Sequence, residues 1–538
     1  MKVTILVYII NPYNVEKPPR LFIKQGAKKI QEISFVDLCR LESVLVSYHV
    51  DDLFASISRC EYRAMKGIID ITQAFKLAHG KQYKGKEGNE PWNIWQMMKK
   101  RYGSEAYVDE LWKLMYTKEI EISERALKNR LNKFSDLILK TWKSVEKELK
   151  KSIEYDRYFN VEKPVNEVFL EQGFKGIRVN QQAVLNRLDR LDQKISEADR
   201  SLRKDYGVRD LNSVSEIKRI LLNSGLNHAA QNNMKNLYNN ILDFYSYHNN
   251  LARLLKEYRD NSRDKRIILR LGAINTDRLY PKYKILGTIT GRIIIESPSL
   301  QYVRRMNRDI VQPDEGKVFL YPDYSQFEPG IMADDSRDER LINDFNSGDL
   351  YLSLSDALFK KEGFRDSAKI LFLAFCYGMS LERMIDFASE SAGLRKSRVA
   401  SVLNEFFGKY KKLLIWRNNL EKELLAKKRI GTRNGNYRYR TFRSKSLKDS
   451  EKRWVISQRI QGTASLILKN TILDINRSFF DVDILLPMHD ALLLQVPIER
   501  EQEYKTAIQE IFINHFKCLC PTISPRVSFK PFFNEEDA

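Results

Sequence analysis

Hydrophobic positions in the first 160 residues follow two different periods. Short strand-like apolar runs, at 3–10 and 68–71, alternate with segments of helical periodicity, and this mixture predicts a small α/β domain. The run from Met1 to Ile10 is too short to span a bilayer, and it has neither a basic start nor a small-residue cleavage site. We therefore expect it to open a soluble domain that covers residues 1–165.

Two long amphipathic helices are predicted next. The first begins after Ser123, and lysines separate its apolar side chains, which recur at helical spacing: Leu127, Leu131, Phe134 and Ile138. The second begins after Asn180, a suitable N-cap, and ends near Gly207. Its apolar positions form a heptad-like seam: Val184, Leu188, Leu191, Ile195 and Ala198. Such a seam usually packs against another helix of the same chain.

The pattern changes again along the rest of the chain. Helical periodicity with basic faces continues through 212–225 and 251–259, which favours a helical subdomain that grips nucleic acid. From about 280 onward, short apolar strands alternate with long helices, and Gly and Pro become frequent between them. Because no internal repeat or low-complexity linker separates these segments, we expect the domains to pack as one body.

Composition narrows the classes of function. A chain of 538 residues is too long for one core, so roughly two to four domains are expected. The 91 Lys and Arg against 70 Asp and Glu leave a net charge of +21, which makes nucleic acid the first partner to consider. The five cysteines are scattered, and Cys518 and Cys520 lack a second Cys/His cluster to complete a zinc site. A reducing compartment is implied.

Two aspartates follow strand-like runs that lie far apart in the sequence. The run 318–321 leads to Asp323, and the run 484–486 leads to His489 and Asp490. Two carboxylates at adjacent strand ends can hold a pair of Mg²⁺ ions, which need hard oxygen ligands, and phosphoryl transfer is then the expected chemistry. Each aspartate in isolation is more simply a helix cap or a turn residue. The motifs around them therefore decide the interpretation.

These surroundings resemble the motifs of the family A DNA polymerases. The segment from Asp323 to Glu328 (Asp-Tyr-Ser-Gln-Phe-Glu) is similar to the family's first catalytic motif, and Met488-His489-Asp490 is similar to its second. Further matches follow in the family's order, over about 170–538: Thr290, Gly291, Arg292, Pro298, Leu300, Gln301, Arg365, Lys369, Tyr377, Gly378, Arg453, Gln461, Gly462, Thr463 and Ala464. Several multi-residue matches in one order make a specific signal.

The resemblance implies an α+β multidomain fold, a right-hand polymerase with an antiparallel palm sheet and helical fingers and thumb. The thumb is expected at 166–275, and the palm and fingers at 276–538 with the fingers at about 340–445. The implied activity is that of a DNA-directed DNA polymerase, which transfers a nucleotide from a dNTP to the 3′-hydroxyl of a primer. The implied cofactors are two Mg²⁺ ions, with Mn²⁺ as a possible replacement, and the implied partners are primer-template DNA and dNTPs, with no membrane.

Residue roles are carried over from the matching motifs. Metal binding is expected of Asp323, Asp490 and the backbone of Tyr324, and catalysis of Asp323, Asp490 and Lys369. The expected nucleotide-binding residues are Ser325, Gln326, Glu328, Tyr351, Arg365, Lys369, Leu373 and Tyr377. The expected DNA-binding residues are Thr290, Arg292, Gln301, Arg453, Gln461 and His489. The simpler alternatives are a solvated basic helix face and ordinary surface polar residues.

The chemistry of these residue types agrees with the implied roles. Arg365 and Lys369 are one helical turn apart, so they can clamp the β- and γ-phosphates of a nucleotide, and Tyr377 is expected on the same helical face, where it can stack on the base. A carboxylate at Glu328, placed against the sugar, leaves no room for a ribose 2′-hydroxyl. Deoxynucleotides are then favoured over ribonucleotides.

Several positions depart from the family's pattern. Pro329 and Gly330 replace an apolar residue and an arginine, Tyr351 replaces a histidine, and Leu373 replaces an aromatic residue. Ala491 stands where an acid is expected, and the arginine-rich turn near Gly435 reads Asn436, Tyr437, Arg438. Because both aspartates remain, we expect activity that is retained but altered in sugar selection, speed or fidelity.

The N-terminal domain departs further. In the family this place often holds a proofreading 3′→5′ exonuclease, and residues 49–52 (His-Val-Asp-Asp) and 68–70 (Ile-Ile-Asp) resemble its later motifs. The opening strand, Val3 to Pro12, contains no carboxylate, although such a nuclease needs an Asp-x-Glu pair there to hold its metals. We expect a degenerate or replaced exonuclease-like domain without proofreading.

Two alternatives stay open at this stage. One is an atypical nucleotidyl transferase that copies RNA or adds nucleotides without a template, and the other is a nucleic-acid-binding protein that has lost catalysis. The expected location is cytoplasmic and nucleoid-associated, or viral or organellar, and not secreted. Repair and replication both fit.

Overall fold

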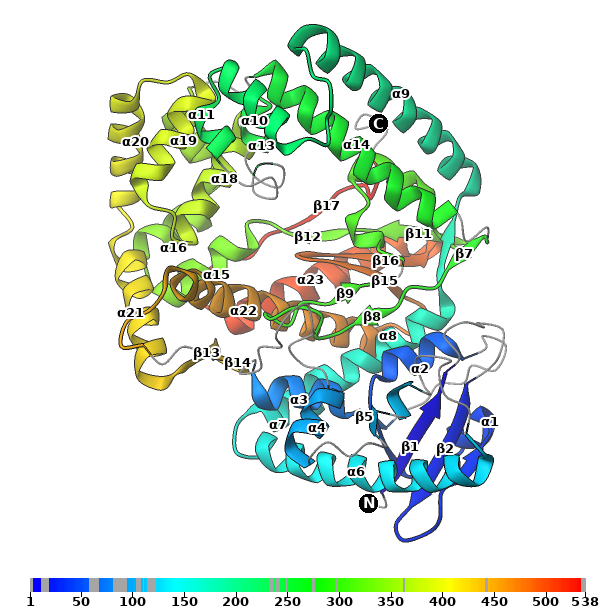
Figure 1. Ribbon diagram of the computed structural model, residues 1–538. Helices are drawn as coiled ribbons and strands as arrows, with labels where there is room; N and C mark the ends of the chain where they lie inside the picture. Colours follow the sequence, from blue (N-terminus) through cyan, green and yellow to red (C-terminus); the bar gives the residue numbers. More distant parts are fainter. Residues whose placement is uncertain are drawn as a thin grey trace.

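The computed structural model describes residues 3–10, 19–57, 67–80, 94–102, 108–109, 111–113, 122–231, 237, 242–247, 249–272, 276–296, 298–360, 363–440 and 444–533 (Figure 1). Met1, Pro12 and Cys60 lie outside these ranges. Within the described ranges, no helix combines the length and the apolar character needed to cross a membrane.

The N-terminal unit is built on a five-stranded sheet in the order β3-β2-β1-β4-β5. Its strands are β1 (Val3–Ile9), β2 (Arg20–Gln25), β3 (Gln31–Ile33), β4 (Val44–Ser47) and β5 (Ile68–Asp70). β4 pairs in parallel with β1 and β5, whereas β2 is antiparallel to β1 and β3. The helices of this unit are α1 (Phe35–Cys39), α2 (Val50–Ser56), α3 (Ile71–His79), α4 (Ile94–Tyr102) and α6 (Glu124–Leu149). The predicted small α/β domain is confirmed.

Helix α6 is the first of the two predicted amphipathic helices. Ser123 caps it, because the Ser123 hydroxyl accepts a hydrogen bond from the backbone N–H of Ala126. Its apolar stripe is buried, and Phe134 stacks on Trp95 of α4 with ring centroids 4.9 Å apart. The chain then continues through α7 (Glu154–Arg157), a π-helical turn (Tyr158–Glu162) and α8 (Lys163–Lys175).

A buried ion network joins this connecting segment to the rest of the molecule. Glu162 accepts from Arg157 at 2.8 Å and from Lys469 of helix α22 (Asp449–Ser478) at 2.5 Å. Glu162 and Lys469 are fully buried, and unpaired charges in such a place would be strongly destabilising. The network therefore fixes how the connecting segment sits on α22.

The second predicted helix, α9 (Gln181–Tyr206), packs along α14 (Asn250–Gly272), at the upper right of Figure 1. Asn180 accepts from the Ala183 N–H, and Gly207 ends the helix with φ +63°, a conformation that favours glycine. The expectation that the seam of α9 packs on another helix of the same chain is confirmed. Shorter helices complete this unit: α10 (Val214–Asn223), α11 (Asn227–Gln231) and α13 (Leu242–Tyr245).

The central sheet is antiparallel, in the order β11-β16-β12-β17, with β15 paired to β16. Its strands are β11 (Lys317–Leu320), β12 (Pro322–Tyr324), β15 (Asp483–Met488), β16 (Ala491–Pro497) and β17 (Val527–Phe529). Helices α22 and α23 (Glu501–Leu519) pack against it. The expected single run at 318–321 is corrected to two short strands, because Pro322 has no N–H for a continuous ladder and the pairing resumes only after Tyr321. Asp323 thus lies inside a strand.

Helices form most of the left side of Figure 1, with one hairpin below them. They are α15 (Phe327–Ser336), α16 (Glu339–Ser347), α17 (Leu350–Leu358), α18 (Arg365–Cys376), α19 (Leu381–Ala392), α20 (Lys396–Gly408) and α21 (Lys411–Lys427), and the hairpin is β13 (Arg429–Thr432) with β14 (Gly435–Tyr439). The remaining elements are β6 (Ile177–Val179), β7 (Arg278–Leu279), β8 (Tyr283–Lys284), β9 (Ile294–Ile295), β10 (Val311–Gln312) and the 3-10 turns Leu300–Tyr302, Arg305–Ile310 and Ile498–Arg500. The predicted α+β multidomain class is confirmed, and the domain boundaries stay predictions.

Candidate active site

The two aspartates singled out in the sequence lie at neighbouring positions of the central sheet. Asp323, in β12, is directly opposite Ala491, the first residue of β16. The backbone N–H of Tyr324 donates to the carbonyl of Asp490 at 3.1 Å. Both carboxylates line one cleft of about 660 Å³. Pairing between distant segments therefore brings the two side chains together.

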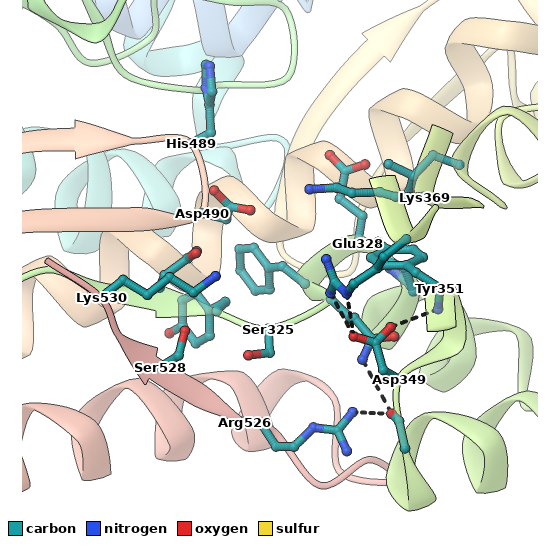
Figure 2. Close-up of a pocket in the computed structure, with 18 of the residues that line it drawn as sticks. Ser325, Glu328, Asp349, Tyr351, Lys369, His489, Asp490, Arg526, Ser528 and Lys530 are labelled. Carbon is teal, nitrogen blue, oxygen red and sulfur yellow. Dashed lines mark hydrogen bonds and ion pairs between the residues drawn. The ribbon is translucent and has the colours of Figure 1, made fainter. Parts of the chain in front are cut away.

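A tight turn between β15 and β16 presents Asp490 to the cleft. His489, in the turn, has a φ of +60°, and the Asp490 N–H donates to the Met488 carbonyl at 2.7 Å. A left-handed conformation is costly for a residue other than glycine and persists where the flanking structure enforces it. Here the paired strands on both sides supply that constraint. In Figure 2 the His489 side chain extends away from Asp490.

The two carboxylates lie in an environment that disfavours their negative charge. Burial and the neighbouring charge of Asp490 raise the pKa of Asp323, and burial likewise raises the pKa of Asp490. One oxygen of Asp323 is buried without a hydrogen-bond partner among the described residues. Two desolvated carboxylates that repel each other are a fitting donor set for a hard divalent cation. Across the described part of the chain no cluster of three His, Cys, Asp or Glu side chains could hold a metal, so backbone oxygens or water would complete the coordination.

Two cations from α18 line the opposite side of the cleft. Arg365 is held by Asp349, whose carboxylate accepts from the guanidinium at 2.9 and 2.7 Å. Lys369 is exposed, and no described carboxylate forms an ion pair with it. It lies near enough to Asp323 and Asp490 to favour their charged forms. Lys369 is therefore a cation available to a ligand.

Tyr377 lies at the end of α18, one residue beyond Cys376, and the helical face that it was expected to share with Arg365 and Lys369 stays a prediction. Tyr377 is the C-cap of the helix, because Gly378 follows with φ +95° and the Met379 N–H bonds back to the Ala374 carbonyl. Its hydroxyl donates to Glu328 at 2.5 Å. Burial and the charge of Glu328 raise the pKa of Tyr377, so the hydroxyl stays protonated.

Glu328 is fixed from two sides. One carboxylate oxygen accepts from Tyr377, and the other accepts from Arg292 at 2.7 Å. Glu328 follows Phe327, the first residue of α15, and it lines the cleft beside the two aspartates. The carboxylate is thus held in a fixed position in the cleft.

Ser325 and Gln326 form the turn between β12 and α15. The Ser325 N–H donates to the Arg526 carbonyl at 2.9 Å, and Gln326 has a φ of +52°. The side chain of Gln326 accepts from the Leu350 N–H at 2.9 Å. Gln326 therefore anchors the start of α17 in addition to lining the cleft.

The residues expected to contact DNA occupy different environments. Arg292 and His489 line the cleft, and burial lowers the pKa of His489. The side chain of Gln301 accepts a hydrogen bond from the Ile295 N–H and donates to the carbonyls of Ile293 and Pro487. The other three are Thr290, which is buried, Gln461, which is half-buried near the Tyr377 hydroxyl, and Arg453, which is exposed on α22. The structure does not bring Thr290, Gln301, Arg453 or Gln461 into the cleft lining.

Two departures from the family pattern have physical explanations, and a third lies in the cleft. A Cβ atom on Gly330 would meet the rings of Phe345 and Phe516 at 2.8 and 2.9 Å, so only glycine permits this helix packing. The ring of Tyr351 is buried under two cations. Its centroid lies 5.3 Å from the guanidinium carbon of Arg365 and 6.0 Å from the ammonium nitrogen of Lys369, so the ring supports both groups. Leu373 lines the cleft with an aliphatic surface.

Four polar residues that line the cleft were not predicted as site residues. They are Asp349, Arg526, Ser528 and Lys530 (Figure 2). Asp349 caps α17 and holds Arg365, whereas the other three alternate along β17 and its flanks. The basic residues spaced along 526–530 were a signal in the sequence, but only strand pairing reveals that they face the aspartates.

Unlike Asp323 and Asp490, the acidic residues of the N-terminal unit are engaged by other groups of the protein. The ammonium of Lys282 pairs with Asp52, and it lies 3.6 Å from Asp51 and 3.4 Å from Glu296. Asp70 is buried and caps α3, accepting from the N–H groups of Val50 and Thr72. These carboxylates are engaged by a lysine and by backbone donors, which is a poor arrangement for metal binding.

Comparison with known proteins agrees with this architecture. Residues 181–524 match the family model described as DNA polymerase family A. Similar proteins include DNA polymerase I of Borreliella burgdorferi, 26% identical over 70% of this chain and 44% of that protein, and thermostable DNA polymerase I of Thermus filiformis, 24% identical over 67% and 46%. The chain therefore spans less than half the length of these curated relatives.

A solved structure extends the comparison to nearly the whole chain. The polymerase domain of Pol1 from M. smegmatis, in complex with DNA primer-template and dNTP, superposes with a TM-score of 0.76 at 18% identity, covering 98% of this chain and 94% of that one. The expected right-hand polymerase fold is thereby confirmed. Since the family model matches 344 of 538 residues (181 to 524 inclusive) and the fold agrees beyond it, the chain belongs to DNA polymerase family A.

Proposed function

We propose that this protein is a DNA-directed DNA polymerase that adds deoxynucleotides to a primer 3′-hydroxyl. The observation that carries the proposal is the pair Asp323 and Asp490, half-buried side by side in a cleft that Lys369 lines from the facing helix. Opposite charges on the two sides of one cleft suit the transfer of a charged phosphoryl group between two substrates. The relatives and the solved structure described above support the same activity.

The proposed cofactor is a pair of Mg²⁺ ions, for which Mn²⁺ is a substitute. Asp323, Asp490 and the Tyr324 carbonyl would hold them, and the Asp323 oxygen that has no hydrogen-bond partner among the described residues agrees with this role. When bound, such ions lower the pKa of an attacking hydroxyl and neutralise charge on a triphosphate. The protein contributes by keeping the two carboxylates desolvated and fixed at adjacent strands.

The nucleotide would bind between α18 and the central sheet. Arg365 and Lys369 are positioned for the phosphates, with the ring of Tyr351 beneath them. Glu328, held by Arg292 and Tyr377, would exclude a ribose 2′-hydroxyl. Ser325, Gln326 and Leu373 would complete the pocket.

The primer-template would run across the cleft from the α9/α14 pair. Arg292 and His489 are candidates for direct contact, because they line the cleft. Arg453 is exposed on α22 and can reach a phosphate backbone. For Thr290, Gln301 and Gln461 we propose a supporting role, since their polar groups are buried or already bonded to the protein.

A direct test is primer extension by the wild-type protein with Mg²⁺ on three substrates: a DNA template, an RNA template, and a primer without a template. Extension that follows the DNA template supports the proposal. Extension only on RNA, or only without a template, would identify the atypical transferase instead. Binding without extension on any substrate would favour a protein that has lost catalysis.

Leu373→Phe is expected to change the discrimination between deoxy- and dideoxynucleotides by at least about tenfold, because one apolar contact in a pocket is worth about 1–3 kcal/mol. The reason is that Leu373 lines the cleft where the sugar would lie. Single-nucleotide incorporation with paired substrates measures the ratio. Leu352→Phe, at a position on α17 that is 46% exposed, is the matched control. An unchanged ratio in Leu373→Phe would refute the sugar-contact role.

We also propose that the N-terminal unit does not proofread. The wild-type protein is expected to leave a labelled single strand intact in the presence of Mg²⁺ or Mn²⁺, because β1 carries no carboxylate and Lys282 already pairs with Asp51 and Asp52. Gel analysis of the 3′ end is the measurement. Metal-dependent degradation that disappears in Asp70→Ala would overturn this.

A further inference from the structure

The C-terminal strand β17 brings polar side chains to the carboxylate pair that no family motif covers. Ser528 lies directly opposite Asp323 in the sheet. Arg526, Ser528 and Lys530 all line the cleft. Residues two apart in a strand point to the same face, so one face of this segment is directed at the aspartates.

The two cations of this segment differ in how they are engaged. The guanidinium of Arg526 donates to the carbonyls of Phe345 and Gly348 at 2.8 and 2.6 Å, and so it supports the protein itself. Lys530 is exposed, and within the described ranges its ammonium group forms no ion pair or hydrogen bond with another side chain. It is close enough to Asp323 and Asp490 to stabilise their negative charge. Lys530 is thus a second cation available to a ligand in the cleft.

Lys530 and Lys369 approach the carboxylates from different sides. In the view of Figure 2, Asp490 lies between them. The chain after Lys530 leads to the α9/α14 pair, where the ring of Phe533 lies 5.5 Å under the guanidinium of Arg187 on α9. Lys369 is therefore on the side of α18, and Lys530 is on the side from which a primer would enter.

We propose that Lys530 binds the phosphodiester next to the primer 3′ terminus and so holds the terminal hydroxyl at the carboxylate pair. This inference rests on the proposed polymerase function. The ligand chemistry is a nucleic-acid phosphate, which an ammonium group recognises by charge-assisted hydrogen bonding without reading the base. Lys530 is on this account specific for the primer, whereas Lys369 acts on the incoming triphosphate.

The test compares three variants with the wild-type protein: Lys530→Ala, Lys530→Arg and Lys517→Ala. Lys517 is exposed near the end of α23 and does not line the cleft, so its variant removes the same charge elsewhere. Lys530→Ala is expected to raise the KM for primer-template about tenfold while the KM for dNTP changes less than about twofold. The plot of the logarithm of the primer-template association constant against the logarithm of the salt concentration should become less steep by about 1. Lys530→Arg should restore most of the primer affinity.

The outcomes separate this inference from the function on which it rests. If the wild-type protein extends primers and Lys530→Ala keeps the wild-type primer KM and salt slope, the inference is wrong and the polymerase function stands. The inference is equally wrong if Lys530→Ala changes only the Mg²⁺ concentration needed for half-maximal rate, since Lys530 would then only balance the carboxylate charge. If the wild-type protein extends no primer at all, the proposed function fails first.

Discussion

Asp323→Asn and Asp490→Asn are each expected to slow primer extension by at least about 1,000-fold, since a lost metal site removes several kcal/mol and each 1.4 kcal/mol is about tenfold in rate. The side chains keep their shape in these variants, but the neutral amides can no longer hold hard cations together. Binding of primer-template should change little, because the proposed contacts to the DNA phosphates are made by cations and not by these two carboxylates. Single-turnover kinetics measures the first quantity and fluorescence anisotropy the second. A variant that retains more than about a tenth of the wild-type rate would contradict the two-carboxylate mechanism.

The thermal stability of the aspartate variants is the control, because it shows whether a loss of activity comes from misfolding. Burial and Asp490 raise the pKa of Asp323 in the folded protein. A carboxyl group whose pKa rises on folding costs stability above its unfolded pKa, so this cost is absent in acid, grows as the pH rises toward the folded value and stays constant above it. Without metal at pH 8, Asp323→Asn should therefore melt no lower than the wild-type protein. Added Mg²⁺ should raise the melting temperature of the wild type only, by mass action.

Lys369→Ala is expected to lower kcat/KM for dNTP by about 100-fold, comparable to the loss of one preorganised charge-stabilising donor. Lys369 is exposed toward the cleft, favours the charged forms of both aspartates and forms no ion pair with any described residue. It is therefore available to the triphosphate, and its removal should leave the KM for primer-template nearly unchanged. Steady-state kinetics with dNTP and primer-template varied in turn is the measurement.

A matched control for Lys369→Ala is Lys411→Ala, which removes an exposed charge at the start of α21, outside the cleft lining. It should behave as the wild type. Arg365 is a less informative target, because its guanidinium is already bonded to Asp349 and its loss would disturb the start of α17 as well. Equal losses in Lys369→Ala and Lys411→Ala would show a general effect of net charge and contradict the specific role.

The sequence pattern was sufficient to predict the elements that depend only on residues close in the sequence. Ser123 and Asn180 cap their helices as expected, because an N-cap needs only a side-chain oxygen and the N–H groups of the next turn. The amphipathic seam of α9 likewise predicted a partner helix, which is α14. The break at Pro322 and the end of α18 at Tyr377 were missed, since each depends on pairing or capping that overrides the apolar run.

By itself, the sequence determined the order of the motifs, the two aspartates with their strand-like flanks, and the absence of a carboxylate in the opening strand. Only the tertiary structure decided which charges remain available. Arg365, Arg526 and Asp51 are engaged by groups up to hundreds of residues away, while Lys369 and Lys530 are not. The physical reason is that hydrogen bonding and desolvation depend on distances in space, and strand pairing between β12, β16 and β17 sets those distances across segments that have no local relation.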